Sequence, residues 1–96
     1  MTAEEEAIQS KGEVSIKLLG AFGSIRNDHI TVEVRGEKSL TEFLENLTEK
    51  YALDLKGFGS YFLVLIDGVE ASLLGGLEAK VKPRSELALI RVSHGG

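Results

Sequence analysis

The sequence contains no cysteine and no tryptophan, and it has only one proline. The lack of cysteine excludes disulfides, thiolate-held iron–sulfur clusters, thiolate zinc sites and cysteine nucleophiles. The only two histidines are His29 and His94, so a zinc site would need carboxylates from unrelated elements, and we expect no metal site. A chain without disulfides suits the reducing cytoplasm, which is the location we expect.

A surplus of positive charge is also missing, because 11 Lys and Arg residues face 15 Asp and Glu residues. Proteins that bind nucleic-acid phosphates usually carry clustered cations, so we expect no direct nucleic-acid partner. The longest apolar run, Tyr61 to Ile66, is far shorter than the roughly 18 residues that span a bilayer. The start, Met-Thr-Ala-Glu-Glu-Glu, lacks the positive charge of a secretory signal, so we expect neither a membrane segment nor export.

Motifs for stand-alone catalysis are absent as well. The glycine-containing stretches 20–24 and 57–60 lack the lysine of a phosphate-binding P-loop, and there is no Gly-x-Ser-x-Gly elbow. A Ser–His–acid arrangement would depend on His29 at a strand start or on His94 near the chain end. We therefore expect a protein that is not itself an enzyme and that binds no cofactor of its own.

What is present fits one small globular domain of 96 residues. Residues 1–12 contain three consecutive glutamates without apolar periodicity, and we expect a flexible acidic extension there. Apolar residues then alternate with polar ones over 14–18 and 30–34, which predicts a hairpin of two strands. Ser39-Leu40-Thr41-Glu42 matches a capping box, so a helix should begin at Leu40, and its apolar stripe should face a sheet.

The second half predicts more strands. Tyr61 to Ile66 is apolar on both faces and predicts a central strand, and Asp67-Gly68 predicts a tight turn into a short strand over 69–71. The last strand is expected over 86–92. One main helix on a mixed sheet of about five strands is an α+β arrangement, and this element order favours the β-grasp fold over residues 13–92.

The last strand could also supply a docking face. If Leu87 and Leu89 point under the helix, then Ala88, Ile90 and Val92 point outward, beside the second apolar face of strand 61–66. The reverse assignment, with Ala88, Ile90 and Val92 in the core, remains open because a shift of one residue exchanges the two faces.

Residues 93–96 end in Gly95-Gly96, and we expect a flexible reactive tail. A carboxylate is a poor electrophile, so its reaction requires conversion to an acyl-adenylate by another protein that holds ATP and Mg²⁺. Two residues without Cβ can pass through a narrow channel in such an enzyme. We therefore expect Gly96 to carry the reactive carboxylate and Gly95 to lie in the channel behind it.

At this point the sequence resembles the ubiquitin-like sulfur carriers and modifiers, which include MoaD, ThiS, archaeal small modifiers and the ubiquitin-related modifier of tRNA thiolation. The resemblance covers about residues 13–96, and it is carried by Leu63-Val64-Leu65-Ile66-Asp67, Leu73-Leu74-Gly75-Gly76-Leu77 and His94-Gly95-Gly96. MoaD proteins usually carry a Pro-Pro pair before the tail and a Gly-Asp turn before the last strand. Here Arg91-Val92-Ser93 and Arg84-Ser85 stand instead.

The resemblance implies that a ubiquitin-activating-type enzyme adenylates Gly96 and that a thiocarboxylate follows. Sulfur would then pass to a sulfurtransferase or tRNA-thiolation enzyme, or the carboxyl end would be joined to lysines of other proteins. One alternative is a MoaD-type small subunit that inserts its tail into the large subunit of molybdopterin synthase. Another is a β-grasp interaction module without chemistry. His94 would either contact the activating enzyme beside Ala88, Ile90 and Val92, or remain solvated.

Overall fold

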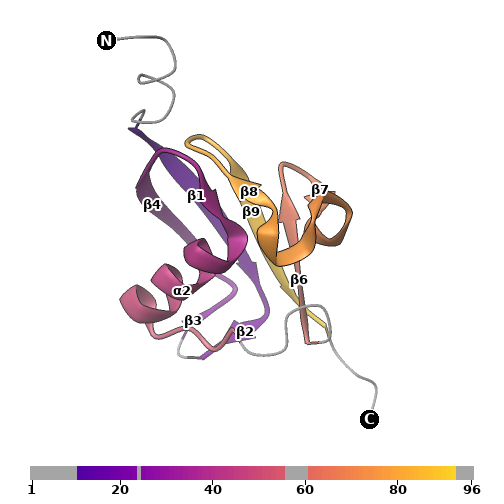
Figure 1. Cartoon of the computed structure of the whole chain (residues 1–96). Helices are drawn as coiled ribbons and strands as arrows, with labels where there is room; N and C mark the ends of the chain where they lie inside the picture. Colours follow the sequence, from indigo (N-terminus) through magenta and orange to yellow (C-terminus); the bar gives the residue numbers. More distant parts are fainter. Residues whose placement is uncertain (1–10, 24, 56–60, 93–96) are drawn as a thin grey trace, which may run out of the picture.

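A mixed sheet of five strands, in the order β4-β1-β9-β6-β7, forms the body of the molecule (Figure 1). The computed structural model describes residues 11–23, 25–55 and 61–92. The neighbouring strands β1 and β9 are parallel, and the other neighbouring pairs are antiparallel. The strands of this sheet are β1 (Lys11–Leu19), β4 (His29–Arg35), β6 (Phe62–Ile66), β7 (Val69–Glu70) and β9 (Glu86–Arg91). The predicted β-grasp arrangement is confirmed.

The first hairpin follows the predicted alternation, with Val14 opposite Val32 and Ile16 opposite Ile30. It begins earlier than predicted, because Lys11 and Gly12 already belong to β1. A Cβ on Gly12 would lie 2.8 Å from Cβ of Pro83, so the strand start packs too closely for a larger residue. The turn that follows β1 contains a second small hairpin, formed by β2 (Ala21–Phe22) and β3 (Ile25–Arg26). Residues 1–10 of the predicted extension lie outside the described residues.

The main helix, α2 (Leu40–Tyr51), begins where the capping box predicts. The Ser39 hydroxyl accepts a hydrogen bond from the backbone N–H of Glu42 at 3.2 Å and lies 3.5 Å from the Glu42 carboxylate. The helix ends at Tyr51, and the C-cap residue Ala52 has a left-handed backbone with φ 54°. Its buried side chains are Leu40, Phe43, Leu44 and Leu47, as the apolar stripe predicts.

The β6–β7 hairpin turns at Asp67 and Gly68, which both have positive φ, 51° and 83°. The Asp67 carboxylate also accepts the backbone N–H of Glu86 at 2.8 Å, which ties this turn to the start of β9. Two short 3₁₀ turns follow, η1 (Ala71–Leu74) and η2 (Gly76–Glu78), separated by Gly75 with φ 105°. They lead into β8 (Lys80–Val81), which pairs with β5 (Lys38–Ser39) at the start of the helix.

The hydrophobic core lies between one face of the sheet and the helix, and Figure 1 shows α2 and the η1–η2 segment in front of the strands. At the end near β2, the rings of Phe22 and Phe62 meet edge-on, with centroids 5.9 Å apart. The opposite face of the sheet has no helix over it among the described elements. Within the described residues, α2 therefore leaves one face of the sheet open, and the candidate site lies there.

Candidate functional site

The last strand has the orientation that a docking face requires. Leu87 and Leu89 are buried in the core, whereas the side chains between them, Ala88 and Ile90, are half-buried on the opposite face. The reverse assignment of this strand is therefore excluded. Strand alternation produces the two environments, because successive side chains point to opposite faces of a sheet.

Neighbouring strands extend this face with further apolar residues. Leu63 of β6 lies opposite Ile90, and Leu65 lies opposite Ala88. On the other side, Leu19 of β1 pairs with Ile90 and is 38% exposed. We call the set the outer apolar patch, and its members are Leu19, Leu63, Leu65, Ala88 and Ile90. A contiguous apolar surface on an open sheet face is a usual feature of protein-docking sites.

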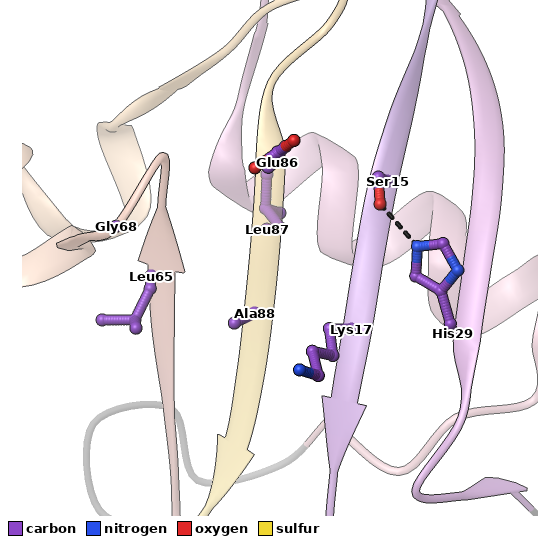
Figure 2. A pocket seen from close by; sticks show the side chains of 8 residues that line it. All are labelled: Ser15, Lys17, His29, Leu65, Gly68, Glu86, Leu87 and Ala88. Carbon is purple, nitrogen blue, oxygen red and sulfur yellow. Dashed lines mark hydrogen bonds between the residues drawn. The ribbon is translucent and has the colours of Figure 1, made fainter.

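A shallow hollow of about 280 Å³ borders the patch where the strands become polar (Figure 2). Its floor includes Leu65 and Ala88, its polar wall comes from Ser15, Lys17 and Glu86, and His29 lies next to Ser15. The opposite charges of Lys17 and Glu86 therefore lie beside the apolar surface. On a docking surface, apolar contacts contribute affinity, and charges of both signs fix the orientation of the bound molecule.

The structure brings together Ser15 and His29, a pair that the sequence did not predict. The Ser15 hydroxyl and His29 Nε2 lie 2.5 Å apart, joined by a hydrogen bond between β1 and β4 (Figure 2). The nearest acid in sequence, Asp28, uses its carboxylate to accept the backbone N–H of His29 at 2.7 Å. The pair lies on an exposed sheet face rather than in a site shielded from water, so we assign it to the polar border of the patch.

Arg91 fixes the end of β9. Its guanidinium donates to the backbone oxygens of Ala21 and Asp54, both at 2.9 Å. It also stacks over the ring of Phe22, with 4.3 Å from the guanidinium carbon to the ring centroid. Because these partners lie in β2 and in the segment after α2, the arginine joins the end of β9 to two other parts of the chain.

Val92, the last described residue, donates its backbone N–H to the carbonyl of Tyr61 at 2.9 Å, and its side chain is half-buried. The predicted tail residues His94, Gly95 and Gly96 lie outside the described residues. Within residues 11–23, 25–55 and 61–92, no group of three or more His, Asp or Glu side chains could hold a metal ion. The same part of the chain has no helix that is long and apolar enough to cross a membrane.

No protein-family model and no curated protein matches this chain. Seven chains of solved structures match it, among them the following two. Small archaeal modifier protein 1 from Methanosarcina acetivorans superposes with a TM-score of 0.59 at 23% identity, over 90% of this chain and 98% of the other. The HVO 2177 protein of Haloferax volcanii superposes with a TM-score of 0.69 at 18% identity, over 90% of this chain and 88% of the other.

Both structures are similar over nearly the whole described body, so the likeness concerns the complete arrangement of strands and helix rather than one hairpin. The chain therefore has the ubiquitin-like β-grasp fold of these archaeal proteins.

Proposed function

We propose that this chain is a ubiquitin-like carrier or modifier whose reactive group is the carboxylate of Gly96. The observation that carries the proposal is the outer apolar patch on a β-grasp sheet, centred on the strand that leads to Gly95-Gly96. The fold likeness to a small archaeal modifier protein supports the same assignment.

The proposed reaction takes place on a partner. A carboxylate oxygen of Gly96, where this residue carries the free carboxyl end, attacks the α-phosphorus of ATP held with Mg²⁺ by an activating enzyme. Pyrophosphate leaves and an acyl-adenylate forms. Hydrosulfide then displaces AMP, and its new C–S bond gives a thiocarboxylate, or a lysine amine of a target protein displaces AMP and loses a proton to form an amide bond. This chain supplies the carboxylate and the docking surface, and the partner supplies the nucleotide site.

The body and the tail would have separate energetic roles in this scheme. Ordering the four residues 93–96 in a channel costs roughly 4–8 kcal/mol of conformational entropy. Contacts of the folded body must offset that cost, and apolar surface contributes about 25 cal/mol per Å² removed from water. The outer apolar patch is the surface we assign to this contact, with Val92 and His94 extending it along the chain toward the reactive end.

Mass spectrometry tests the proposal on protein isolated from the cells that make it. Replacement of one oxygen by sulfur at the carboxyl end marks a sulfur carrier, and Gly-Gly remnants on lysines of other proteins mark a modifier. A MoaD-type subunit would show the sulfur form and copurify with a larger synthase subunit. Neither product in cells that express the protein would contradict the carrier and modifier assignments and leave an interaction module.

A further inference from the structure

A groove of about 470 Å³ lies between α2 and η2, on the helix side of the sheet. Figure 1 shows the η1–η2 segment beside the helix. Three leucines form the apolar part of the groove, and they belong to α2, to the segment after it and to η2: Leu44, Leu55 and Leu77. Leu44 is nearly buried and Leu55 is half-buried, whereas Leu77 is 43% exposed. The groove therefore has apolar surface that a bound molecule can remove from water.

The two walls of this groove are joined by a hydrogen bond. The Thr41 hydroxyl, in the first turn of α2, donates to the backbone carbonyl of Leu77 at 2.9 Å. The Thr48 hydroxyl donates to the carbonyl of Leu44 in its own helix, also at 2.9 Å. Both hydroxyl protons are therefore used within the chain, and the groove is already formed in the chain without a partner.

The charged residues that line the groove are both acidic. Glu45 and Glu49 are exposed and lie one helical turn apart on this flank of α2. Among the described residues, neither carboxylate has an ion-pair partner, and like charges four residues apart on a helix repel each other. Lys38 and Lys50 instead line a separate hollow on the other flank of α2, together with Glu33. The groove therefore favours a partner that brings positive charge.

The backbone of the groove walls favours a helical partner over an extended one. In η2, the N–H groups of Glu78 and Ala79 donate to the carbonyls of Gly75 and Gly76, at 3.2 and 3.1 Å. Because α2 and η2 are helical turns, neither offers a strand edge with which an extended segment could pair. A helix forms its own backbone hydrogen bonds and can place apolar side chains from successive turns in such a groove.

We propose that the groove between α2 and η2 binds an amphipathic helix of a partner protein, with aliphatic side chains on one face and lysine or arginine beside them. The aliphatic side chains contact Leu44, Leu55 and Leu77, and the cations pair with Glu45 and Glu49. The outer apolar patch lies on the opposite face of the sheet, so this second surface goes beyond the proposed function and does not rest on it.

Titration of the ¹⁵N-labelled full chain with two synthetic helical peptides tests this site by NMR. Both peptides have leucines at positions i, i+3, i+4 and i+7, and the leucines are flanked by lysines in one peptide and by glutamates in the other. We expect the lysine peptide to shift the amide signals of Leu44, Thr48 and Leu77, and to bind at least about tenfold more tightly than the glutamate peptide. Combining Glu45→Lys with Glu49→Lys should reverse that preference. Equal binding of the two peptides, or no binding of the lysine peptide at millimolar concentration, would overturn the proposal.

The apolar part of the proposal is tested by Leu77→Asn, which changes no charge. We expect at least about a tenfold loss of affinity for the lysine peptide, because the exposed leucine of the groove is lost. Leu73→Asn is the matched control, since Leu73 is 76% exposed in η1 and does not line the groove, and it should bind as the wild type does. If Leu77→Asn does not fold, the charge-reversal variant decides the outcome alone. Equal losses in the two asparagine variants, shifts confined to the outer apolar patch, or shifts in the groove that depend on protein concentration without peptide, as a second copy of the chain would cause, would also contradict the proposal.

Discussion

Leu89 and Ile90 are adjacent in sequence and lie in opposite environments. Leu89 is 0% exposed in the core, and Ile90 is half-buried on the open face. A carboxylate at the first position would be buried without a partner, at a cost of several kcal/mol, whereas at the second position it could reach water. A substitution by aspartate is therefore expected to disrupt folding at Leu89 and to weaken docking at Ile90.

We predict that Ile90→Asp folds and binds the activating enzyme at least about tenfold more weakly than the wild type. The reason is that a charge in the outer apolar patch would have to lose its hydration on docking. Leu89→Asp, the matched control, should fail to fold. Circular dichroism and a binding titration measure both effects, and unchanged affinity of Ile90→Asp would remove the patch from the docking surface.

We also predict that Arg91→Met lowers the free energy of unfolding by about 2 kcal/mol, because two charged hydrogen bonds and the stacking on Phe22 are lost. Arg26→Met is the control. Arg26 is exposed in β3, so its replacement should change stability by no more than about 0.5 kcal/mol. Urea denaturation gives both values, and equal losses would mean that the contacts of Arg91 contribute nothing to holding the end of β9.

At the scale of elements, the start of α2 depends on one side chain. Ser39→Ala should cost about 1 kcal/mol, because the backbone N–H of Glu42 loses its acceptor at the helix start. Ser72→Ala is a suitable control, since Ser72 is exposed in η1 and that turn has no side-chain cap. Thermal unfolding of the two variants compares them directly. A Ser39→Ala protein as stable as the Ser72→Ala protein would contradict a stabilising role for the cap.

The elements that could be predicted from sequence are those with a strict local pattern. Alternation predicted β1, β4 and β9, but it left open which face of β9 enters the core, and only the structure decides this. The capping box predicted the start of α2. The η1–η2 turns were missed. The β5–β8 pair was missed because Lys38 and Val81 are far apart in the sequence and pair only in the folded chain. In the candidate site, the apolar sequence of β6 indicated that Leu63 and Leu65 lie beside β9. The contacts of Arg91 with Ala21 and Asp54 depend on tertiary structure, and no local sequence pattern indicates them.

At the scale of the whole molecule, we propose that the body accounts for folding and the tail for the reaction. Deleting Gly95 and Gly96 should therefore leave the melting temperature within a few degrees of the wild type, because neither residue has a side chain to bury. The same deletion should abolish ATP-dependent activation. Differential scanning calorimetry checks the first effect. A large drop in melting temperature would show that the tail contributes to the fold.

ATP–pyrophosphate exchange catalysed by the activating enzyme, with wild-type protein and with Gly96→Ala as substrates, tests whether Gly96 is the reactive residue. The added Cβ displaces the carboxylate from its line of attack, and a displacement of about 1 Å can slow a reaction about a hundredfold. A parallel binding titration should show little change, because the proposed docking surface is on the sheet and not in the tail. We predict strongly reduced exchange for Gly96→Ala with nearly wild-type binding; equal exchange rates for the two proteins would contradict the assignment of Gly96 as the reactive residue.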